Sequence, residues 1–342
     1  MIEIAAITIL LAFAFTFTNG FQDASSVAAT LVASRSTTPK MGIVMVAGMS
    51  FLGAVLGGSA VAFTLSGLLT LDPGVQTLRV LLAAILSATL WNLATWSYGL
   101  PSSSTHALIG GLVGAGMAAA GMGSVYWGVE ELLAPQPEVV GMVKILFFFV
   151  ASVFVGFVGS YLMRRTTALL LRNAKKTVTW RIIGLNRITA ALMAFFNGAN
   201  DSQKQLGIIA LVLFAAGESA AVAVPLWARL TCAVLLALGT LGGGWRIMRT
   251  LGRRIFKIEP IHSFDSQVSS AATIAFSTLA GAPVSSTHVI TTSVIGVGAA
   301  ENPQRVHWGV GKEIVAAMVV TIPGTALSGA LVYFAISLFT GA

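Results

Sequence analysis

Long apolar stretches run through this chain, and their length constrains its fold more than any other feature. A helix of about 17 to 25 apolar residues crosses the hydrocarbon core of a bilayer, which is about 30 Å thick. Stretches of that length or longer lie at 41–70, 75–98, 139–163, 219–243 and 313–338. Shorter or interrupted ones lie near 2–34, 101–121, 188–213, 264–282 and 283–299. The sequence therefore predicts an all-α integral membrane protein.

Composition supports this prediction. Only 9% of the 342 residues are Asp, Glu, Lys or Arg, against about a quarter in soluble domains. The first eighteen residues begin with MIEI and carry neither a basic start nor a small-residue cleavage site, so we expect a retained span rather than a signal peptide. Cys232 is the single cysteine, which excludes an intrachain disulfide. We expect no cofactor.

Basic residues are concentrated in two segments, 164–187 and 246–257. Together they hold twelve of the twenty lysines and arginines, and neither contains an acidic residue. Segment 122–138 carries three glutamates and no basic residue. The positive-inside rule then predicts that both basic loops are cytoplasmic in a multi-pass protein of the cell membrane. We expect these charges to meet lipid headgroups, and we expect no nucleic-acid partner.

Two motifs occur twice, in the same order. FTNGFQD at 17–23 matches FFNGAND at 195–201, and PSSSTHALIGGLVGAG at 101–116 matches PVSSTHVITTSVIGVG at 283–298. The two offsets, 178 and 182 residues, are nearly equal, which indicates a duplication. We divide the chain into a first repeat (1–163), a basic cytoplasmic linker (164–187) and a second repeat (188–342).

Each repeat holds about five spans, giving 10 to 12 transmembrane segments in all. An odd number of spans turns the second copy upside down, so we expect an inverted-topology repeat with both termini outside. In such folds, broken or re-entrant helices meet near the membrane midplane. Asn-Gly in the first motif and Pro101 in the second are residues that favour a helix break, so we expect the breaks there.

The serine-rich motifs place hydroxyl groups where a new helix would begin. The first turn of a helix has unpaired N–H groups and binds anions. Two such starts, one from each repeat, could converge on a tetrahedral oxyanion. The residues predicted to bind it are Ser103, Ser104, Thr105, Ser285, Ser286 and Thr287. For His106 and His288, which close the motifs, we expect a structural hydrogen-bonding role.

Asp23 and Asp201 are the sharper signal, because a carboxylate at membrane depth costs several kcal/mol unless it is paired, protonated or ion-bound. Two carboxylates beside an anion site would repel the anion unless cations or protons arrive with it. Amide oxygens near both aspartates are of the type that hard cations prefer. The predicted coupling residues are Asp23, Asp201, Asn19, Asn197, Gln22 and Gln203. Lys204 is expected to pair with Asp201 or to anchor at the membrane interface, rather than to contact the substrate directly.

Taken together, these segments resemble the inorganic phosphate transporter (PiT) family of secondary carriers. The resemblance spans the whole chain, through NGFQDASSVAATLVASR, PSSSTH, NGANDSQKQLGIIAL, GGWRIMRTLGRRI and PVSSTH. It implies phosphate import by symport with sodium or protons, commonly in a homodimer. It also implies that Asp23, Asn200 and Asp201 bind substrate or ion. Gln22, Ser26 and Gln267 depart from the family pattern, so sodium and proton coupling both stay open.

Two alternatives remain beside phosphate symport. A branch of the same family carries sulfate, but the first-repeat aspartate and Thr-His features that we expect to be eroded there persist in this chain. More remotely, two membrane aspartates could form an aspartyl-protease dyad that shares one proton. The paired serine-rich helix starts have no part in peptide hydrolysis, so the sequence favours a carrier that is not an enzyme.

Overall fold

The protein is described here by a computed structural model. It covers residues 1–98, 102–175, 177–254 and 257–340, and for residues 22–25, 243–254, 310, 314 and 340 it describes the helix but not the side chains. The first half contains α1 (Ile2–Ala33), α2 (Pro39–Leu56), α3 (Ala60–Ser66), α4 (Val75–Tyr98), α5 (Ser104–Ala120), α6 (Val129–Leu132) and α7 (Gly141–Leu170). The second contains α8 (Val178–Ala215), α9 (Leu226–Arg254), α10 (Pro260–Leu279), α11 (Ser286–Glu301) and α12 (Trp308–Thr340). Two short 3-10 helices, at Met122–Ser124 and Pro303–Arg305, lie in loops.

Within the described residues, six helices are long and apolar enough to cross a membrane: α1, α2, α4, α7, α8 and most of α12. Their outer faces carry exposed apolar side chains such as Leu10, Val150 and Leu331. A soluble protein rarely exposes large apolar surfaces of this kind, whereas lipid accepts them. The prediction of an all-α membrane protein is confirmed.

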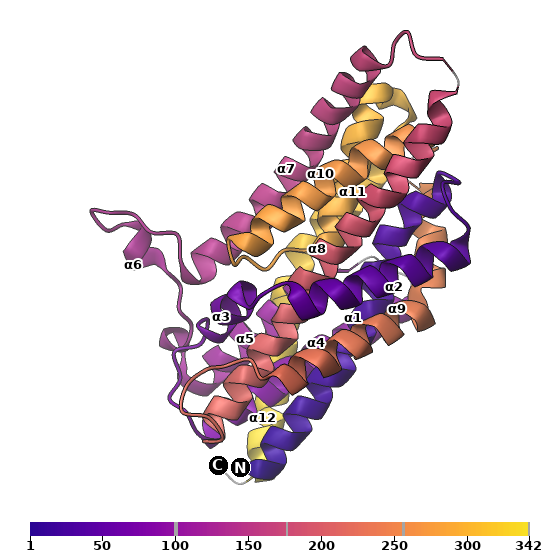
Figure 1. Cartoon of the computed structure of the whole chain (residues 1–342). Coiled ribbons are helices and arrows are strands. Elements are labelled where there is room, and N and C mark those ends of the chain that lie inside the picture. The colour runs from indigo at the N-terminus through magenta and orange to yellow at the C-terminus, as the bar shows by residue number, and fades with distance from the viewer. Residues whose placement is uncertain (99–101, 176, 255–256, 341–342) are drawn as a thin grey trace.

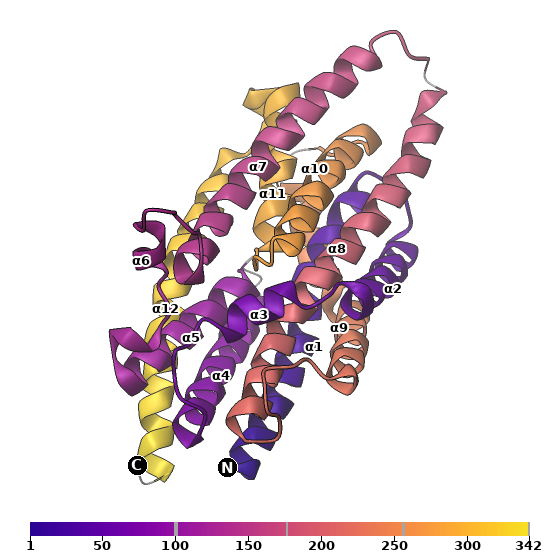
Figure 2. The same cartoon turned by 60° about the vertical axis from the view of Figure 1, so that its left-hand side comes forward.

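The chain ends lie together at one end of the molecule, and the connection between α7 and α8 lies at the other (Figures 1 and 2). That connection is shorter than the expected linker 164–187, because α7 continues to Leu170 and α8 begins at Val178. The basic residues at both ends of the predicted linker therefore extend from helices.

Two helical hairpins point toward each other from opposite ends. Hairpin α4–α5 lies in the half that holds the termini and hairpin α10–α11 in the other half (Figures 1 and 2). Helix α5 has 17 residues and α11 has 16, so each is only about 25 Å long and stops short of a full span. A hydrogen bond of 3.0 Å from the Thr105 hydroxyl to the Val284 carbonyl joins the two hairpins where they meet.

Helices α5 and α11 begin at the serine-rich motifs, as the sequence predicts. Ser103 and Ser285 are the N-caps, with extended backbones, and their hydroxyls accept hydrogen bonds from the backbone N–H groups of His106 and His288. An N-cap hydroxyl replaces a missing backbone partner in the first turn. Pro101, to which the break was assigned, lies outside the described residues.

The expectation of a break at Asn-Gly is wrong. Asn19 and Gly20 lie inside the continuous α1, and Asn197 and Gly198 lie inside the continuous α8. The glycines serve close packing instead, because a Cβ on Gly20 would overlap the backbone of α9 and a Cβ on Gly198 would overlap the Ser50 carbonyl of α2. Each aspartate motif is therefore held on an unbroken helix against a neighbouring one.

A break occurs where the sequence predicts one continuous span, 41–70. Helix α2 ends at Leu56 and α3 begins at Ala60. The Gln203 side chain fixes this junction: it accepts a hydrogen bond from the Val61 N–H at 2.8 Å and donates to the Gly57 carbonyl at 2.7 Å. Sequence reasoning overlooked the turn signal of residues 57–59, Gly-Gly-Ser.

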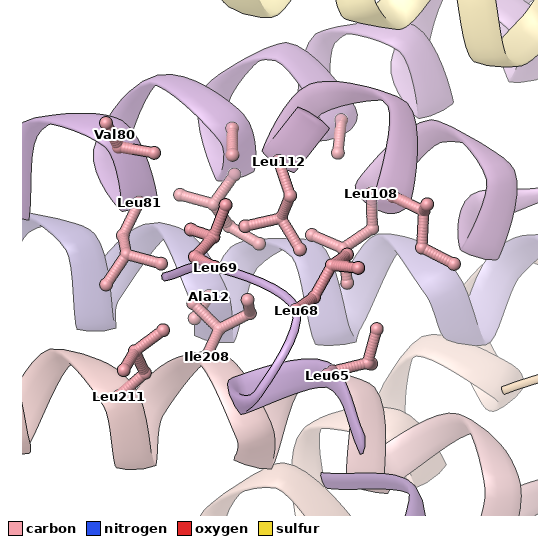
Figure 3. Close-up of a cluster of buried hydrophobic side chains, with 14 of the residues drawn as sticks. Ala12, Leu65, Leu68, Leu69, Val80, Leu81, Leu108, Leu112, Ile208 and Leu211 are labelled. Carbon is pink, nitrogen blue, oxygen red and sulfur yellow. The ribbon is translucent and has the colours of Figure 1, made fainter. Parts of the chain in front are cut away.

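The main apolar core packs the hairpin α4–α5 against the α3 and α8 helices (Figure 3). Leu65 and Leu68 from the α3 region, Leu108 and Leu112 from α5, and Ile208 from α8 are all buried in it. Cores of this kind are close-packed and deform little. The start of α5 and the aspartate motif of α8 are therefore held in fixed positions relative to each other.

Candidate functional site

A buried ion pair joins Asp201, the last residue of the second aspartate motif, to Lys204, three positions further along the chain. The Lys204 ammonium lies 2.6 Å from one carboxylate oxygen of Asp201, and the two side chains are 1% and 0% exposed. They are three residues apart on α8 and so share one face of the helix. The expected ion pair is confirmed, and because Lys204 is fully buried the alternative of an interfacial anchor is wrong.

Lys204 also contacts both hairpins. Its ammonium donates to the Thr105 hydroxyl at 2.5 Å and to the Val284 carbonyl at 3.0 Å. Three oxygen atoms therefore surround it, from α8, from the start of α5 and from the turn before α11. This cluster joins the first repeat to the second.

Asn200 holds the turn between α10 and α11. Its amide nitrogen donates to the Thr278 hydroxyl at 3.0 Å and to the Ala282 carbonyl at 3.1 Å, and its amide oxygen accepts from the Val284 N–H at 3.3 Å. Both ends of the amide are thus in use. Asn200 positions the Val284 carbonyl that Lys204 contacts.

The first repeat makes the corresponding contact with a different residue. Ser26 follows Asp23 by three positions, as Lys204 follows Asp201, and the Ser26 hydroxyl lies 3.4 Å from the Thr287 hydroxyl. We call Asp23, Ser26 and Thr287 the first half-site. Asp201, Lys204 and Thr105 form the second half-site. The side chains of Gln22 and Asp23 lie outside the described residues.

The serine-rich motifs are buried at the starts of α5 and α11. Ser103, Ser104, Thr105, Ser285, Ser286 and Thr287 are all less than 5% exposed. The Ser286 hydroxyl has no hydrogen-bond partner among the described residues. Thr105 and Thr287 extend toward α8 and α1 respectively, so the structure brings each motif to the aspartate helix of the other repeat.

His106 and His288 face each other across the two repeats, with ring centroids 5.1 Å apart. His106 stacks on Phe149 at 4.0 Å, and its Nδ1 lies 2.6 Å from the Ser103 hydroxyl. Both ring nitrogens of the buried His288 lack a partner among the described residues. The structural role expected from the sequence fits His106, but no contact of that kind supports it for His288.

Several buried oxygen atoms near the aspartate motifs have no partner among the described side chains. They are Asn19 Oδ1, Asn197 Oδ1 and the second carboxylate oxygen of Asp201. An unsatisfied buried acceptor costs about 1 to 3 kcal/mol, and carboxylate and amide oxygens are ligands for hard cations. These three residues remain available for the predicted coupling role, whereas the Gln203 amide is committed to the α2–α3 junction.

A second polar cluster lies at the end of the molecule opposite the termini, and sequence reasoning missed it. Arg164 of α7 donates to Glu301, the last residue of α11, at 2.6 and 2.7 Å, and lies 3.6 Å from Asp265 of α10. Thr167 donates to Asp265 at 2.8 Å. Arg164 was interpreted only as part of the basic segment 164–187, and the two acids lie far from it in sequence, so only the fold brings them together.

A cavity of about 900 Å³ opens beside this cluster, between the end of α1 and the loops that flank α10 and α11. A much smaller space of about 10 Å³ lies deeper, bounded by Ser26 of α1 and Thr291 of α11. Ile258 lines both. The smaller space holds at most one water molecule.

Gln267 occupies a position where the family pattern led us to expect an acid. Its side chain bridges α1 and α8, the helices that carry Asp23 and Asp201, away from the two aspartates. Its amide nitrogen donates to Thr30 of α1 at 2.9 Å, and its amide oxygen accepts from Thr189 of α8 at 3.2 Å. A neutral amide can donate to one helix and accept from the other, which a carboxylate cannot do.

Comparison with known proteins places this geometry among membrane carriers. The profile of the phosphate transporter family matches residues 19–186 and 176–329. A probable low-affinity inorganic phosphate transporter of Rhizobium meliloti (strain 1021) is 41% identical over 331 residues, 96% of this chain and 96% of the relative. A protein of the same description from Bacillus subtilis (strain 168) is 35% identical over 346 residues, 99% of this chain and 98% of the relative.

One solved structure has the same fold. A protein described as the sodium-dependent phosphate transporter matches with a TM-score of 0.88 at 25% identity, over 98% of this chain and 99% of that one. The likeness spans both halves of the chain.

Proposed function

This chain belongs to the phosphate transporter family, and on that premise we propose that it imports inorganic phosphate by symport with a cation, sodium or a proton. The single observation that carries the proposal is the buried junction of Asp201, Lys204 and Thr105 between two hairpins. Buried charges in an apolar bundle are costly and mark solute or ion pathways.

The family and the relatives are transporters, so the prediction that the chain is not an enzyme is confirmed. An aspartyl-protease dyad needs two carboxylates that share a proton, whereas Asp201 is paired with a lysine. The sulfate alternative gains no support from the relatives described above.

Phosphate is proposed to bind between the starts of α5 and α11, through Ser103, Ser104, Thr105, Ser285, Ser286 and Thr287. Two helix N-termini that approach from opposite ends of the molecule support this, because each presents N–H donors and a partial positive charge to an oxyanion. Hydroxyls both donate and accept, which suits a partly protonated phosphate. Asp23, Asn200 and Asp201 would border this anion site.

Coupling is proposed to arise from Asp23 and Asp201, since a carboxylate beside the anion must be neutralised before phosphate binds stably. The unpartnered oxygens of Asn19 and Asn197 support a cation site near the aspartates. Gln22 and Gln203 complete the predicted set, although the Gln203 contacts favour a structural role. The membrane potential adds about 2.3 kcal/mol per charge per 100 mV, so import with excess positive charge would be driven by it.

Orientation follows from the positive-inside rule. We place the loops 164–187 and 246–257 in the cytoplasm and both termini outside, so the cavity beside Glu301 would open to the cytoplasm. Arg172→Cys and Glu138→Cys should react with an impermeant maleimide from the inner and the outer face respectively. The reverse pattern would overturn this orientation. In the proposed orientation the two repeats are inverted relative to each other. The family resemblance also leads us to propose a homodimer, and light scattering of the purified protein measures its mass.

Uptake by purified protein in proteoliposomes tests the function. We expect labelled phosphate to accumulate under an inward sodium gradient or an inward proton gradient, and not in liposomes without protein. Absence of accumulation under both gradients would contradict the proposal. Displacement of bound phosphate by an equal concentration of sulfate would revive the sulfate alternative.

A further inference from the structure

The surroundings of the Lys204 ammonium are those of a bound metal cation. A carboxylate oxygen, a hydroxyl oxygen and a backbone carbonyl oxygen lie 2.5 to 3.0 Å from it. These are the donor types that hard cations take in proteins. An ammonium has three N–H donors, and each has an acceptor here, so the group is saturated in the way that a coordinated ion is.

We propose that Lys204 is a tethered cation that takes the place of a transported one at Asp201. The lysine is attached to α8 and its side chain is buried, so its charge neutralises Asp201 without entering or leaving with the substrate. The transported cation is then confined to the half of the site that contains Asp23. This inference rests on the proposed function and narrows it, because it assigns the soluble cation to Asp23 alone and gives Asp201 a resident one.

The first half-site provides the internal contrast. Serine, which carries no charge, occupies the position three residues after Asp23, and its hydroxyl meets Thr287 as the Lys204 ammonium meets Thr105. The duplicated geometry is retained while the charge is present on one side only. No lysine follows Asp23 at the corresponding position in the sequence, so the charge of this aspartate is to be balanced by a cation from solution.

A purely structural role for Lys204 would predict a different response to substitution. A clamp that only holds α5 and the α11 turn against α8 would, when removed, weaken phosphate binding by the same factor at every ion concentration. A tethered cation that is removed leaves Asp201 in need of a soluble one. By linkage, binding of one further cation steepens the dependence of phosphate affinity on cation concentration by about one power.

The test is phosphate binding to the full-length purified protein in nanodiscs, by isothermal titration calorimetry, over a range of sodium concentrations and of pH. The slope of log Kd for phosphate against log cation concentration counts the cations taken up with phosphate. Lys204→Asn should steepen that slope by about one relative to the native protein. Asp201→Asn, which leaves the lysine in place, should not flatten it, whereas Asp23→Asn should flatten it by about one.

The matched control is Asp201→Asn combined with Lys204→Asn, which removes both charges and should return the slope to the native value. An unchanged slope in Lys204→Asn, or a flatter one in Asp201→Asn, would overturn the inference while the proposed function stands. If the native protein binds no phosphate in any ion or at any pH, the proposed function fails first. Should Lys204→Asn not fold, the two single aspartate variants still decide the question.

Discussion

The two half-sites have matching positions and different chemistry. In the second, a charged lysine joins Asp201 to Thr105, and every contact is 2.6 Å or shorter. In the first, the neutral Ser26 lies 3.4 Å from Thr287. In both half-sites, the helix that carries the aspartate meets the start of the hairpin helix from the other half of the chain. The residue three positions after the aspartate, lysine in one half-site and serine in the other, therefore determines whether the half-site contains a positively charged side chain.

A second contrast separates the two histidines of the same motifs. His106 pairs with the Ser103 hydroxyl and stacks on Phe149, whereas neither ring nitrogen of His288 has a partner among the described residues. The first-repeat histidine is therefore fixed by its own motif and the second is not. The resident charge of Lys204 and the unsatisfied imidazole of His288 both lie in the second repeat, and this asymmetry can be tested residue by residue.

The largest effect is expected for Lys204→Met, which removes the resident charge and leaves Asp201 buried without a partner. Breaking one member of a buried ion pair costs about 3 to 5 kcal/mol, so the free energy of unfolding should fall by that amount. Denaturant unfolding in detergent micelles measures it. Combining the change with Asp201→Asn removes both charges and should restore most of the loss. A loss below about 1 kcal/mol in Lys204→Met would remove the distinction between the half-sites.

A smaller effect is expected for Asp23→Asn, because this carboxylate has no lysine in the corresponding position. Loss of the soluble cation should weaken phosphate binding by at least about thirtyfold, which corresponds to about 2 kcal/mol of lost interaction with a charged group. Calorimetric titration at saturating cation measures it. Asp23→Glu, which keeps the charge, serves as the control and should lose less. Equal losses in both variants would argue that shape rather than charge matters at this position.

Thr105 and Thr287 occupy corresponding positions in the two half-sites, and we expect the substitution of Thr105 to cost more stability. Thr105→Val removes an acceptor of a charged donor, and such hydrogen bonds contribute about 1.5 to 3 kcal/mol. Thr287→Val removes a longer contact between neutral hydroxyls, and we expect a loss nearer 1 kcal/mol. Unfolding free energies of the two variants, measured under one set of conditions, give the comparison. A larger loss in Thr287→Val would reverse the ranking of the half-sites.

The smallest difference is expected between the histidines. His106→Leu should lower the free energy of unfolding by about 1 kcal/mol, because it breaks the pairing with Ser103. His288→Leu removes two ring nitrogens that have no partner in the part of the chain that the structure describes, and it should leave stability unchanged or slightly higher. Thermal unfolding without phosphate separates these outcomes from any effect on binding. A clear loss of stability in His288→Leu would show that its imidazole has a structural partner.

The sequence predicted the parts of the fold that depend on local chemistry. Ser103 and Ser285 were identified as helix starts because hydroxyls cap helices, and the apolar stretches 75–98, 139–163 and 313–338 were identified as spans. Asn-Gly was misinterpreted because glycine also permits two helices to approach closely, and a single sequence does not distinguish a break from a contact. The break at residues 57–59 was missed although its glycine pair was visible.

The contacts that define the site could not be predicted in the same way. The pairing of Lys204 with Asp201 lies within one helical turn and was predicted, but Thr105 and Val284 come from segments 99 and 80 residues away. Gln203 was proposed as an ion ligand from its neighbours in sequence, and its actual partners lie in the α2–α3 junction. Which long-range partner a polar side chain selects depends on the packing of whole helices.

The ion pair between Arg164 and Glu301 affects how α11 can move. Glu301 is the last residue of α11, and Ser286 and Thr287 form its first turn. A helix of four turns bends little, so a tilt at one end is transmitted to the other. Any rearrangement that releases Glu301 at the cavity would therefore also shift the hydroxyls at the opposite end, about 24 Å away. In mechanical terms, opening toward the cavity and displacing the hydroxyls proposed to bind phosphate are one movement.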